Sequence, residues 1–316
     1  MSFISVLFAL LLEQARPLSR GNPIHAAMRS WVRYCSRNLD AGKPLHGWLA
    51  WGLAVGLPSG LALLIYWSLI YWVGWPLAVL WSALVLYASL GFRQFSFHFT
   101  EIRDALANDD DALARTLLAQ WQHIDTQSWS RSDIIGRVIE FSVLAAHRNV
   151  FGVLAWFSVL AALGLGPMGA VLYRLAEFVT RYWQHKSKAL EQPVSLALQT
   201  NAQKAWHWID SLPARMTVLG FAVVGNFEEA IDGWRRYAAQ SSTDNDGLVL
   251  AATAGAINIQ LGTTTNPPSA AGLTTGASLR PPPELAHMAI LVGLVWRAVV
   301  MWVVLLALLT LARLIA

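Results

Sequence analysis

The sequence has little cysteine and little charge. Cys35 is the one cysteine in 316 residues, and Asp, Glu, Lys and Arg together make up 13% of the chain. A single cysteine excludes an intramolecular disulfide framework and a zinc cluster built from cysteines. Soluble domains carry about 25% charged residues, whereas this chain is 55% hydrophobic. The composition therefore excludes an ordinary soluble domain and indicates a membrane protein.

Tryptophan and net positive charge are present in excess. The chain has 16 Trp residues and a formal net charge of +4. Trp is enriched where lipid tails meet headgroups, because its ring is apolar and its N–H needs a polar partner. Positive charge can also attract nucleic acid, but basic loops beside apolar segments explain it better here. We expect the lipid bilayer as a partner, and no nucleic acid.

Three apolar segments approach the ~20 residues that are needed to cross a ~30 Å hydrocarbon core. They are residues 48–72, 75–91 and 286–316. Only Val73 and Gly74 separate the first two segments, which predicts a tight helical hairpin. We expect these three segments to be full membrane spans.

Two further apolar segments are short or interrupted. Residues 150–179 contain a break rich in glycine and proline at 164–169, and residues 212–224 form a short apolar run. The first is either one kinked span or a pair of half-helices that enters and leaves on the same face. Non-helical backbone at membrane depth is tolerated where it is buried in protein or lines a cavity. Short or re-entrant helices are therefore expected in both places.

Basic residues decide the expected orientation. Residues 13–47 contain six Lys or Arg against two Asp or Glu, and residues 174–215 contain six more basic residues. Cytoplasmic loops of membrane proteins carry an excess of Lys and Arg. The loops at 13–47, 92–149 and 181–211 are therefore expected in the cytoplasm, in a multi-pass protein of a bacterial-type inner membrane.

The expected fold class is all-α: a polytopic helical membrane protein with short or re-entrant helices and a cytoplasmic helical loop domain at about residues 92–149. Within that loop, Asp109–Asp111 precede an apolar stripe at helical spacing, which predicts a solvated helix start. A Thr-, Pro- and Gly-rich tract at about 263–283 is expected to be a flexible loop. Residues 1–316 are expected to form a single membrane domain.

Several local motifs follow one another along the chain. Glu13 is followed by Gly21-Asn22-Pro23-Ile24-His25, and residues 105–126 read ALANDDDALARTLLAQWQHIDT. Further on come EFSVLAAHRNVFG, GPMGAVLYRLAEFVTRYWQHK, AWHWIDSLPARMTVLGFAVVG, and Asn245 with LVLAATAGAINIQLG. In this order the motifs resemble the CobD/CbiB family of cobalamin-assembly membrane proteins, and the surroundings of AWHWIDSLPARMTVLGFAVVG also look AmpE-like.

The resemblance is closest in residues 105–126, which are similar to a family helix that ends in Asp-Thr. Glu140 stands fourteen residues past Thr126, at the spacing of the first Glu in the family's Glu-Thr-Val-Ala-Glu-Asn motif. The second Glu, the Asn and a later Asp of that motif are not evident here. Asn22 replaces the Asp of the family's Gly-Asp-Pro, and Glu177 replaces an Asn. Part of the family's acidic set is therefore lost.

The resemblance implies a reaction and its residues. The family is implicated in joining an aminopropanol unit, or its phosphate, to adenosylcobyric acid, which gives cobinamide in a step linked to ATP and Mg²⁺. Mg²⁺ and ATP are the expected cofactors if this activity is retained, and no other cofactor is assigned. The expected partners include a corrinoid substrate and further copies of the chain in a homo-oligomer. The candidate catalytic carboxylates are Glu140, Asp125, Asp210 and Glu177. The candidate substrate contacts are His25, Arg115, Thr126, Arg174, Arg215 and Asn245, and no metal ligand is assigned.

The lost acidic residues leave enzymatic activity open. An AmpE-like, non-enzymatic membrane protein linked to β-lactamase induction or cell-wall stress is the alternative, and a transporter is a third class. Structural roles also compete with function at single residues. Asp125 could cap a turn, Asp210 could be a helix N-cap, and Arg174 and Arg215 could extend toward the membrane surface.

Overall fold

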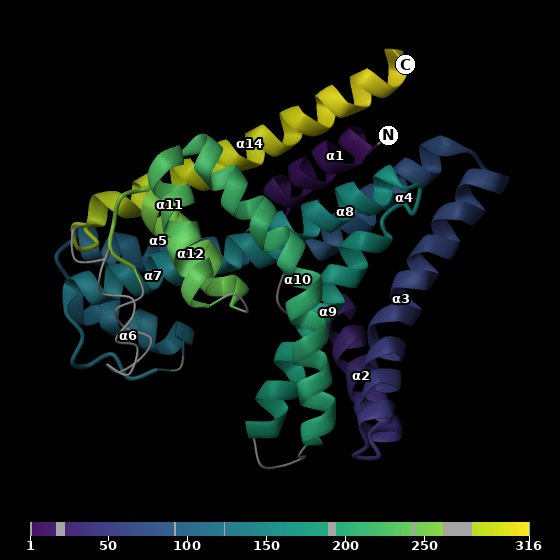
Figure 1. The fold of residues 1–316 in the computed structure, drawn as a ribbon, viewed down its shortest axis with the longest axis horizontal. Coiled ribbons are helices and arrows are strands. Elements are labelled where there is room, and N and C mark those ends of the chain that lie inside the picture. The colour runs from purple at the N-terminus through teal and green to yellow at the C-terminus, as the bar shows by residue number, and fades with distance from the viewer. Residues whose placement is uncertain are drawn as a thin grey trace. The chain divides into compact units, whose positions relative to one another are not determined.

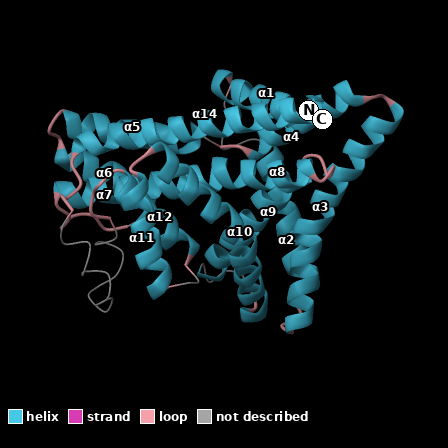
Figure 2. Cartoon of the chain, turned by 45° about the horizontal axis from the view of Figure 1, so that its top comes forward, coloured by secondary structure: helices cyan, strands magenta, loops and turns pink. Residues whose placement is uncertain are grey.

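A computed structural model describes residues 2–16, 23–91, 93–122, 124–188, 194–241, 244–261 and 280–315. Within these ranges the chain forms helices and no strand (Figure 2). The all-α prediction is confirmed. Asn22 and most of the tract predicted as a flexible loop lie outside the described residues. The end of that tract is described, and the ring of Pro283 packs closely on Gly136.

Three helical stretches among the described residues are long and apolar enough to cross a membrane. They are Pro44–Trp72, Arg131–Ala162 and Leu285–Ala312. The first and last contain most of two predicted spans, so the protein is a helical membrane protein. The segment predicted as a span at 75–91 forms a helix of 15 residues. At 1.5 Å per residue it is about 22 Å long, shorter than the ~30 Å hydrocarbon core.

The Arg131–Ala162 stretch overlaps the predicted loop domain at 92–149. α7 (Arg131–Ala146) continues through the π-helical turn η1 (His147–Phe151) into α8 (Gly152–Ala162) without a break. The end of the polar loop is predicted at residue 149, because His147, Arg148 and Asn149 are polar. The helix passes through these residues, and the boundary drawn at 149 does not coincide with the end of an element.

The contacts divide the chain into two compact units. The first unit comprises Met1–Gly91, Arg148–Pro213 and Leu305–Ala316. Its helices are α1 (Ser2–Ala15), α2 (Pro23–Leu39), α3 (Pro44–Trp72), α4 (Trp75–Ser89), α8, α9 (Met168–Lys188) and most of α10 (Leu196–Val224). Its core gathers Val32 and Cys35 from α2, Ala54 from α3, Trp183 from α9 and Leu198 from α10. The single thiol is therefore a buried core group.

The predicted hairpin between the first two apolar segments is confirmed. α3 ends at Trp72 and α4 begins at Trp75, and the two helices contact each other. Gly74 makes the turn with φ 108°, in the left-handed region that glycine enters without steric cost. Pro58 lies inside α3, which continues through it.

Residues 150–179 form two helices rather than one kinked span. α8 and α9 are separated by a turn in which Gly164 and Gly166 have φ of 81° and 55°. The helices pack antiparallel (Figure 1), because Gly152 faces Tyr173 while Gly169 faces Trp156. A Cβ on Gly169 would lie 2.1 Å from the Trp156 carbonyl oxygen, so glycine is required for this close packing.

The second unit comprises Phe92–His147 and Ala214–Val304. Its helices are α5 (Arg93–Ala107), α6 (Asp111–Gln122), α7, α11 (Phe227–Gln240), α12 (Asn245–Ala256) and most of α14 (Leu285–Ile315). α11 and α12 lie side by side (Figure 1). The predicted helix start is confirmed, since α6 begins at Asp111 and Asp110 Oδ1 accepts from the Leu113 amide. Arg131 Nη1 contacts both Asp109 and Asp111, which ties this helix start to α7.

Candidate functional site

The first unit contains a cluster of charged and polar side chains around α9. We call it the α9 cluster, and it consists of Arg148, Asn149, Tyr173, Arg174, Glu177, Arg181 and Asp210. η1 supplies the first two residues, α9 the next four and α10 the last. The α9 members recur at intervals of three and four residues, which places them on one side of that helix.

Among the residues of the α9 cluster that form ion pairs, Glu177 is the most deeply buried, with 5% of the residue exposed. Arg174 Nη1 lies 3.1 Å from its Oε2, and Arg181 Nε lies 2.7 Å from its Oε1. Burial opposes ionisation of this carboxyl group, but Arg181, Arg174 and Arg148 hold its pKa below the ordinary value. Glu177 is therefore a carboxylate at neutral pH, enclosed by arginines.

Arg174 joins η1 to α9. Its Nη1 donates to Asn149 Oδ1 at 2.6 Å and to Glu177 Oε2 at 3.1 Å. A π-helical turn inserts an extra residue into a helix and recurs at functional sites. Here the turn carries Asn149, whose side chain fixes one end of the Arg174 guanidinium.

Tyr173 and Asp210 connect α9 to α10. The Tyr173 hydroxyl donates to Asp210 Oδ1 at 2.7 Å, and both residues are fully buried. Burial, together with the adjacent Asp210 carboxylate, raises the pKa of Tyr173 well above its ordinary value. The alternative that Asp210 is a helix N-cap is wrong, because α10 runs without interruption from Leu196 to Val224 through Pro213.

His25 extends the cluster from α2. It is half-buried, and its Nδ1 is buried without a hydrogen-bond partner among the described residues. Burial, followed by the positive charges of Arg174 and Arg29, lowers the pKa of its imidazole. The structure thus brings together four predicted site residues: His25, Arg174, Glu177 and Asp210.

The other predicted residues belong to the second unit, and three of them organise one loop. Thr126 Oγ1 donates to the Arg115 carbonyl at 2.9 Å, and Arg115 Nε donates to the Trp129 carbonyl at 3.0 Å. Asp125 Oδ1 accepts from the Gln127 amide at 3.1 Å, as expected for a residue that caps a turn. These bonds give each residue a structural role, and a role in catalysis or binding stays a prediction.

The three remaining predicted residues lie on three different helices of the second unit. Glu140 is buried in α7, where its Oε2 is 3.1 Å from Arg137 Nη1. Asn245 is the buried first residue of α12, and Arg215 is exposed on α10. Their predicted roles are likewise untested.

Sequence reasoning did not select Arg148, Asn149, Tyr173 or Arg181 as site residues. The signal for Tyr173 and Arg181 is the spacing of ionisable side chains along residues 173–181, where Arg and Glu recur on one helical face. The Asn149 contact had no such signal, because it depends on how η1 packs against α9.

The charge balance of the α9 cluster favours an anionic ligand. Three arginines face two acidic residues, Glu177 and Asp210. Arginine guanidinium groups bind carboxylate and phosphate oxygens with paired donors. The cluster can therefore bind a carboxylate or a phosphate.

The cluster does not fit a magnesium site. Mg²⁺ requires carboxylate oxygens that are free to coordinate it. Both oxygens of Glu177 contact arginines, and Asp210 Oδ1 accepts from Tyr173. Within the described part of the chain, no three or more His, Cys, Asp or Glu residues are grouped so that they could hold a metal ion. No step is therefore assigned to a metal ion held by these residues.

Comparisons with known proteins agree on one family. The sequence model of the CobD/Cbib protein family matches residues 6–267. The chain is 29% identical to the Cobalamin biosynthesis protein CobD of Stutzerimonas stutzeri, over 96% of each chain. It is 33% identical to the protein of the same name from Chromobacterium violaceum, over 56% of this chain and 54% of the relative. It is 30% identical to the one from Leptospira interrogans, over 60% of this chain and 58% of the relative.

No solved structure matches the chain significantly. The AmpE-like resemblance finds no support, since the four curated relatives that match all bear the CobD name. The family model covers most of the chain, and the Stutzerimonas relative aligns along almost its whole length. The chain belongs to the CobD/CbiB family.

Proposed function

We propose that this membrane protein acts in cobalamin biosynthesis, where it joins an aminopropanol unit, or its phosphate, to adenosylcobyric acid to give cobinamide. Membership of the CobD/CbiB family and the names of its relatives support a role in this pathway. The observation that carries the proposed step is the α9 cluster, in which arginines outnumber carboxylates around a partly buried position. Both reactants carry groups that such a cluster binds, a carboxylate on the corrinoid and a phosphate on the aminopropanol.

Within the cluster, Arg174 and Arg148 would bind the carboxylate or phosphate oxygens. Donors fixed in a water-poor site stabilise developing negative charge more strongly than the same donors in water. Glu177 and Asn149 would hold the Arg174 guanidinium in one orientation, since both accept hydrogen bonds from its Nη1. Arg174 is therefore the residue on which binding should depend most.

His25 would accept a proton. Amide formation joins the amine nitrogen to the carboxyl carbon, while the bond from that carbon to its activated oxygen breaks and the oxygen leaves with the phosphoryl group that ATP supplied. The nitrogen must lose a proton as the new bond forms. The lowered pKa of His25 favours the neutral imidazole, which can accept that proton. ATP would supply the activation of the carboxylate, and no residue is assigned to its binding.

Turnover by the purified protein tests this function. The protein in lipid nanodiscs is incubated with adenosylcobyric acid, aminopropanol phosphate, ATP and Mg²⁺, and the corrinoid products are separated by chromatography and mass spectrometry. We expect an amide product, and Arg174→Ala should lower its rate of formation about 100-fold, as for loss of one transition-state donor. Arg33→Ala, at an exposed position of α2, is the matched control and should keep full activity. A folded wild-type protein that forms no product under these conditions would overturn the proposal.

We also propose that the protein is a multi-pass inner-membrane protein whose basic loops face the cytoplasm. The basic residues of 13–47 support this orientation. Reporter fusions after residue 40 and after residue 73 test it, because these positions flank α3. The first fusion should be active as a cytoplasmic reporter and the second as a periplasmic reporter, and the reverse pattern would contradict the orientation.

A further inference from the structure

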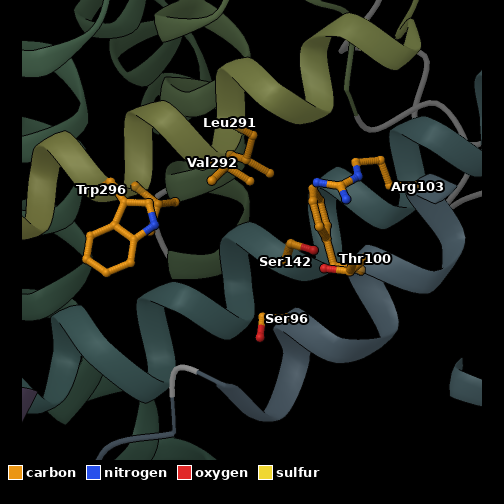
Figure 3. A pocket seen from close by; sticks show the side chains of 9 residues that line it. Ser96, Thr100, Arg103, Ser142, Leu291, Val292 and Trp296 are labelled. Carbon is orange, nitrogen blue, oxygen red and sulfur yellow. The ribbon is translucent and has the colours of Figure 1, made fainter. Parts of the chain in front are cut away.

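The second unit contains a cavity between three helices. α5, α7 and α14 enclose a volume of about 160 Å³ (Figure 3). α14 contributes Leu291, Val292, Val295 and Trp296, whereas α5 contributes Ser96, Thr100 and Arg103 among others. The cavity is part of a different unit from the α9 cluster. Binding at this cavity does not depend on the proposed reaction.

The size of the cavity limits its occupant. Sites for drug-sized ligands are roughly 300–1,000 Å³, so a cavity of 160 Å³ is too small for a corrinoid macrocycle. A cavity of about 150 Å³ lined by apolar side chains holds one small apolar group such as benzene. The volume therefore suits one section of a narrow hydrocarbon chain.

Two of the three helices that line this cavity belong to candidate membrane spans. Leu291, Val292 and Val295 belong to the candidate span Leu285–Ala312, and Ser142 belongs to the candidate span Arg131–Ala162. The surrounding medium of such helices is hydrocarbon, and a lipid acyl chain is its most abundant component. An acyl chain therefore matches both the apolar lining and the surroundings of these helices.

One end of the cavity carries the guanidinium of Arg103, which forms an ion pair with Asp104. Arg103 and Trp296 stand at opposite ends of the lining side chains (Figure 3). Arg103 Nε and Nη2 both contact Asp104 Oδ1, at 3.0 and 2.8 Å, and the Arg103 side chain is 44% exposed. Asp104 therefore occupies the edge of the guanidinium formed by Nε and Nη2, and not Nη1. α5 also contributes the hydroxyl groups of Ser96 and Thr100 to the lining.

We propose that this cavity binds an anionic phospholipid, with one acyl chain between α5 and α14 and the headgroup phosphate on Arg103. The apolar α14 wall would hold the chain by burial of hydrocarbon, and the guanidinium would select the charge of the headgroup. The lipid would thereby join α5 to the candidate spans of the second unit.

Photocrosslinking of the full chain tests the acyl-chain position. The protein in nanodiscs receives phosphatidylglycerol with a diazirine in one acyl chain, and adducts are mapped by peptide mass spectrometry. We expect adducts concentrated on residues 96–103 and 291–296. Adducts spread evenly along the exposed face of α14, including Val300 and Val304, would mean general contact with the bilayer and would overturn the proposal.

Native mass spectrometry of the detergent-solubilised protein tests headgroup selection. Arg103→Gln should lower retention of phosphatidylglycerol about tenfold, the loss expected for one charge-assisted hydrogen bond. Retention of phosphatidylcholine should fall less, because its choline cation offsets the charge of its phosphate. Arg236→Gln is the matched control, because Arg236 is similarly exposed and pairs with Asp232 away from the cavity lining. Equal retention of both lipids by the wild type and Arg103→Gln would contradict headgroup selection.

Filling the cavity gives a second variant. Val292→Trp should reduce retention of phosphatidylglycerol, whereas Val300→Trp, at a position that is 56% exposed on the same helix, should not. Unchanged retention by a folded Val292→Trp protein would contradict the acyl-chain position. The crosslinking map of the wild type needs no substitution, so it decides the proposal even if this variant does not fold.

Discussion

The Tyr173 hydroxyl donates a hydrogen bond of 2.7 Å to Asp210 Oδ1, and the two residues have no exposed surface. This bond links α9 to α10 at the centre of the α9 cluster. Tyr173 also carries the ring against which Gly152 of α8 packs. One side chain therefore fixes three helices of the first unit.

Removing the Tyr173 hydroxyl should destabilise the protein. Tyr173→Phe leaves the ring in place but removes a donor from a buried carboxyl group, which costs about 1–3 kcal/mol. Chemical unfolding in detergent micelles measures this change in the free energy of unfolding. Tyr34→Phe, on an exposed residue of α2, is the control and should leave stability unchanged. Equal stability of the Tyr173→Phe protein and the wild type would contradict the role of this bond.

A Cβ at position 152 should also destabilise the first unit. The Cβ of an alanine there would lie 2.1 Å from Tyr173 Cζ, so the ring or α8 must move. Overpacking of this kind costs typically about 1–3 kcal/mol. Gly56→Ala is the matched control, because nothing stands within 4 Å of a Cβ at that position in α3. Comparison of thermal unfolding temperatures measures both, and a drop of similar size in the two variants would refute the packing argument.

Glu177 should make stability depend on pH in the acid range. Arg181, Arg174 and Arg148 hold its pKa below the ordinary carboxyl value despite burial. A carboxyl group with a lowered pKa in the folded state stabilises the fold above its unfolded pKa, near 4.5. That stabilisation is lost as the pH falls through the lowered folded-state pKa.

Unfolding temperatures between neutral pH and about pH 3 measure this dependence, as expected from proton linkage. The wild type should lose stability as the pH falls below 4.5, the ordinary value for this carboxyl group. Glu177→Gln should be less stable at neutral pH, because two arginines lose their partner, and should lose less further stability in acid. An identical acid dependence in both proteins would show that Glu177 does not contribute.

Much of the fold could be predicted from apolar runs. The hairpin at Val73-Gly74 and the spans in α3 and α14 follow from composition and length alone, because hydrocarbon allows only long apolar helices to cross it. The continuity of α7 with α8 could not be predicted. Polar residues at 147–149 resemble the end of a loop, and the π-helical turn that contains them depends on neighbouring helices.

The candidate site could be predicted only in part. Glu177 is predicted because an ionisable residue near an apolar segment is costly and recurs at functional positions. Arg174 is predicted from its match to a motif of the family. Asn149 is not predicted, since its contact with Arg174 joins residues 25 positions apart through the packing of η1 against α9. The structural partners of Arg115 and Thr126 were also hidden, because they are backbone carbonyl groups that a sequence pattern does not show.

Complementation of a bacterial strain that lacks the cobinamide-forming step tests whether the protein forms cobinamide and whether the α9 cluster is required. Corrinoids extracted from the cells are quantified by mass spectrometry, with membrane levels of each variant checked by immunoblot. We expect the wild type and Arg33→Ala to restore cobinamide formation, whereas Arg174→Ala and Glu177→Gln, present at equal levels in the membrane, should restore little or none. Absence of cobinamide in cells that carry the folded wild type, or full restoration by both cluster variants, would contradict the account.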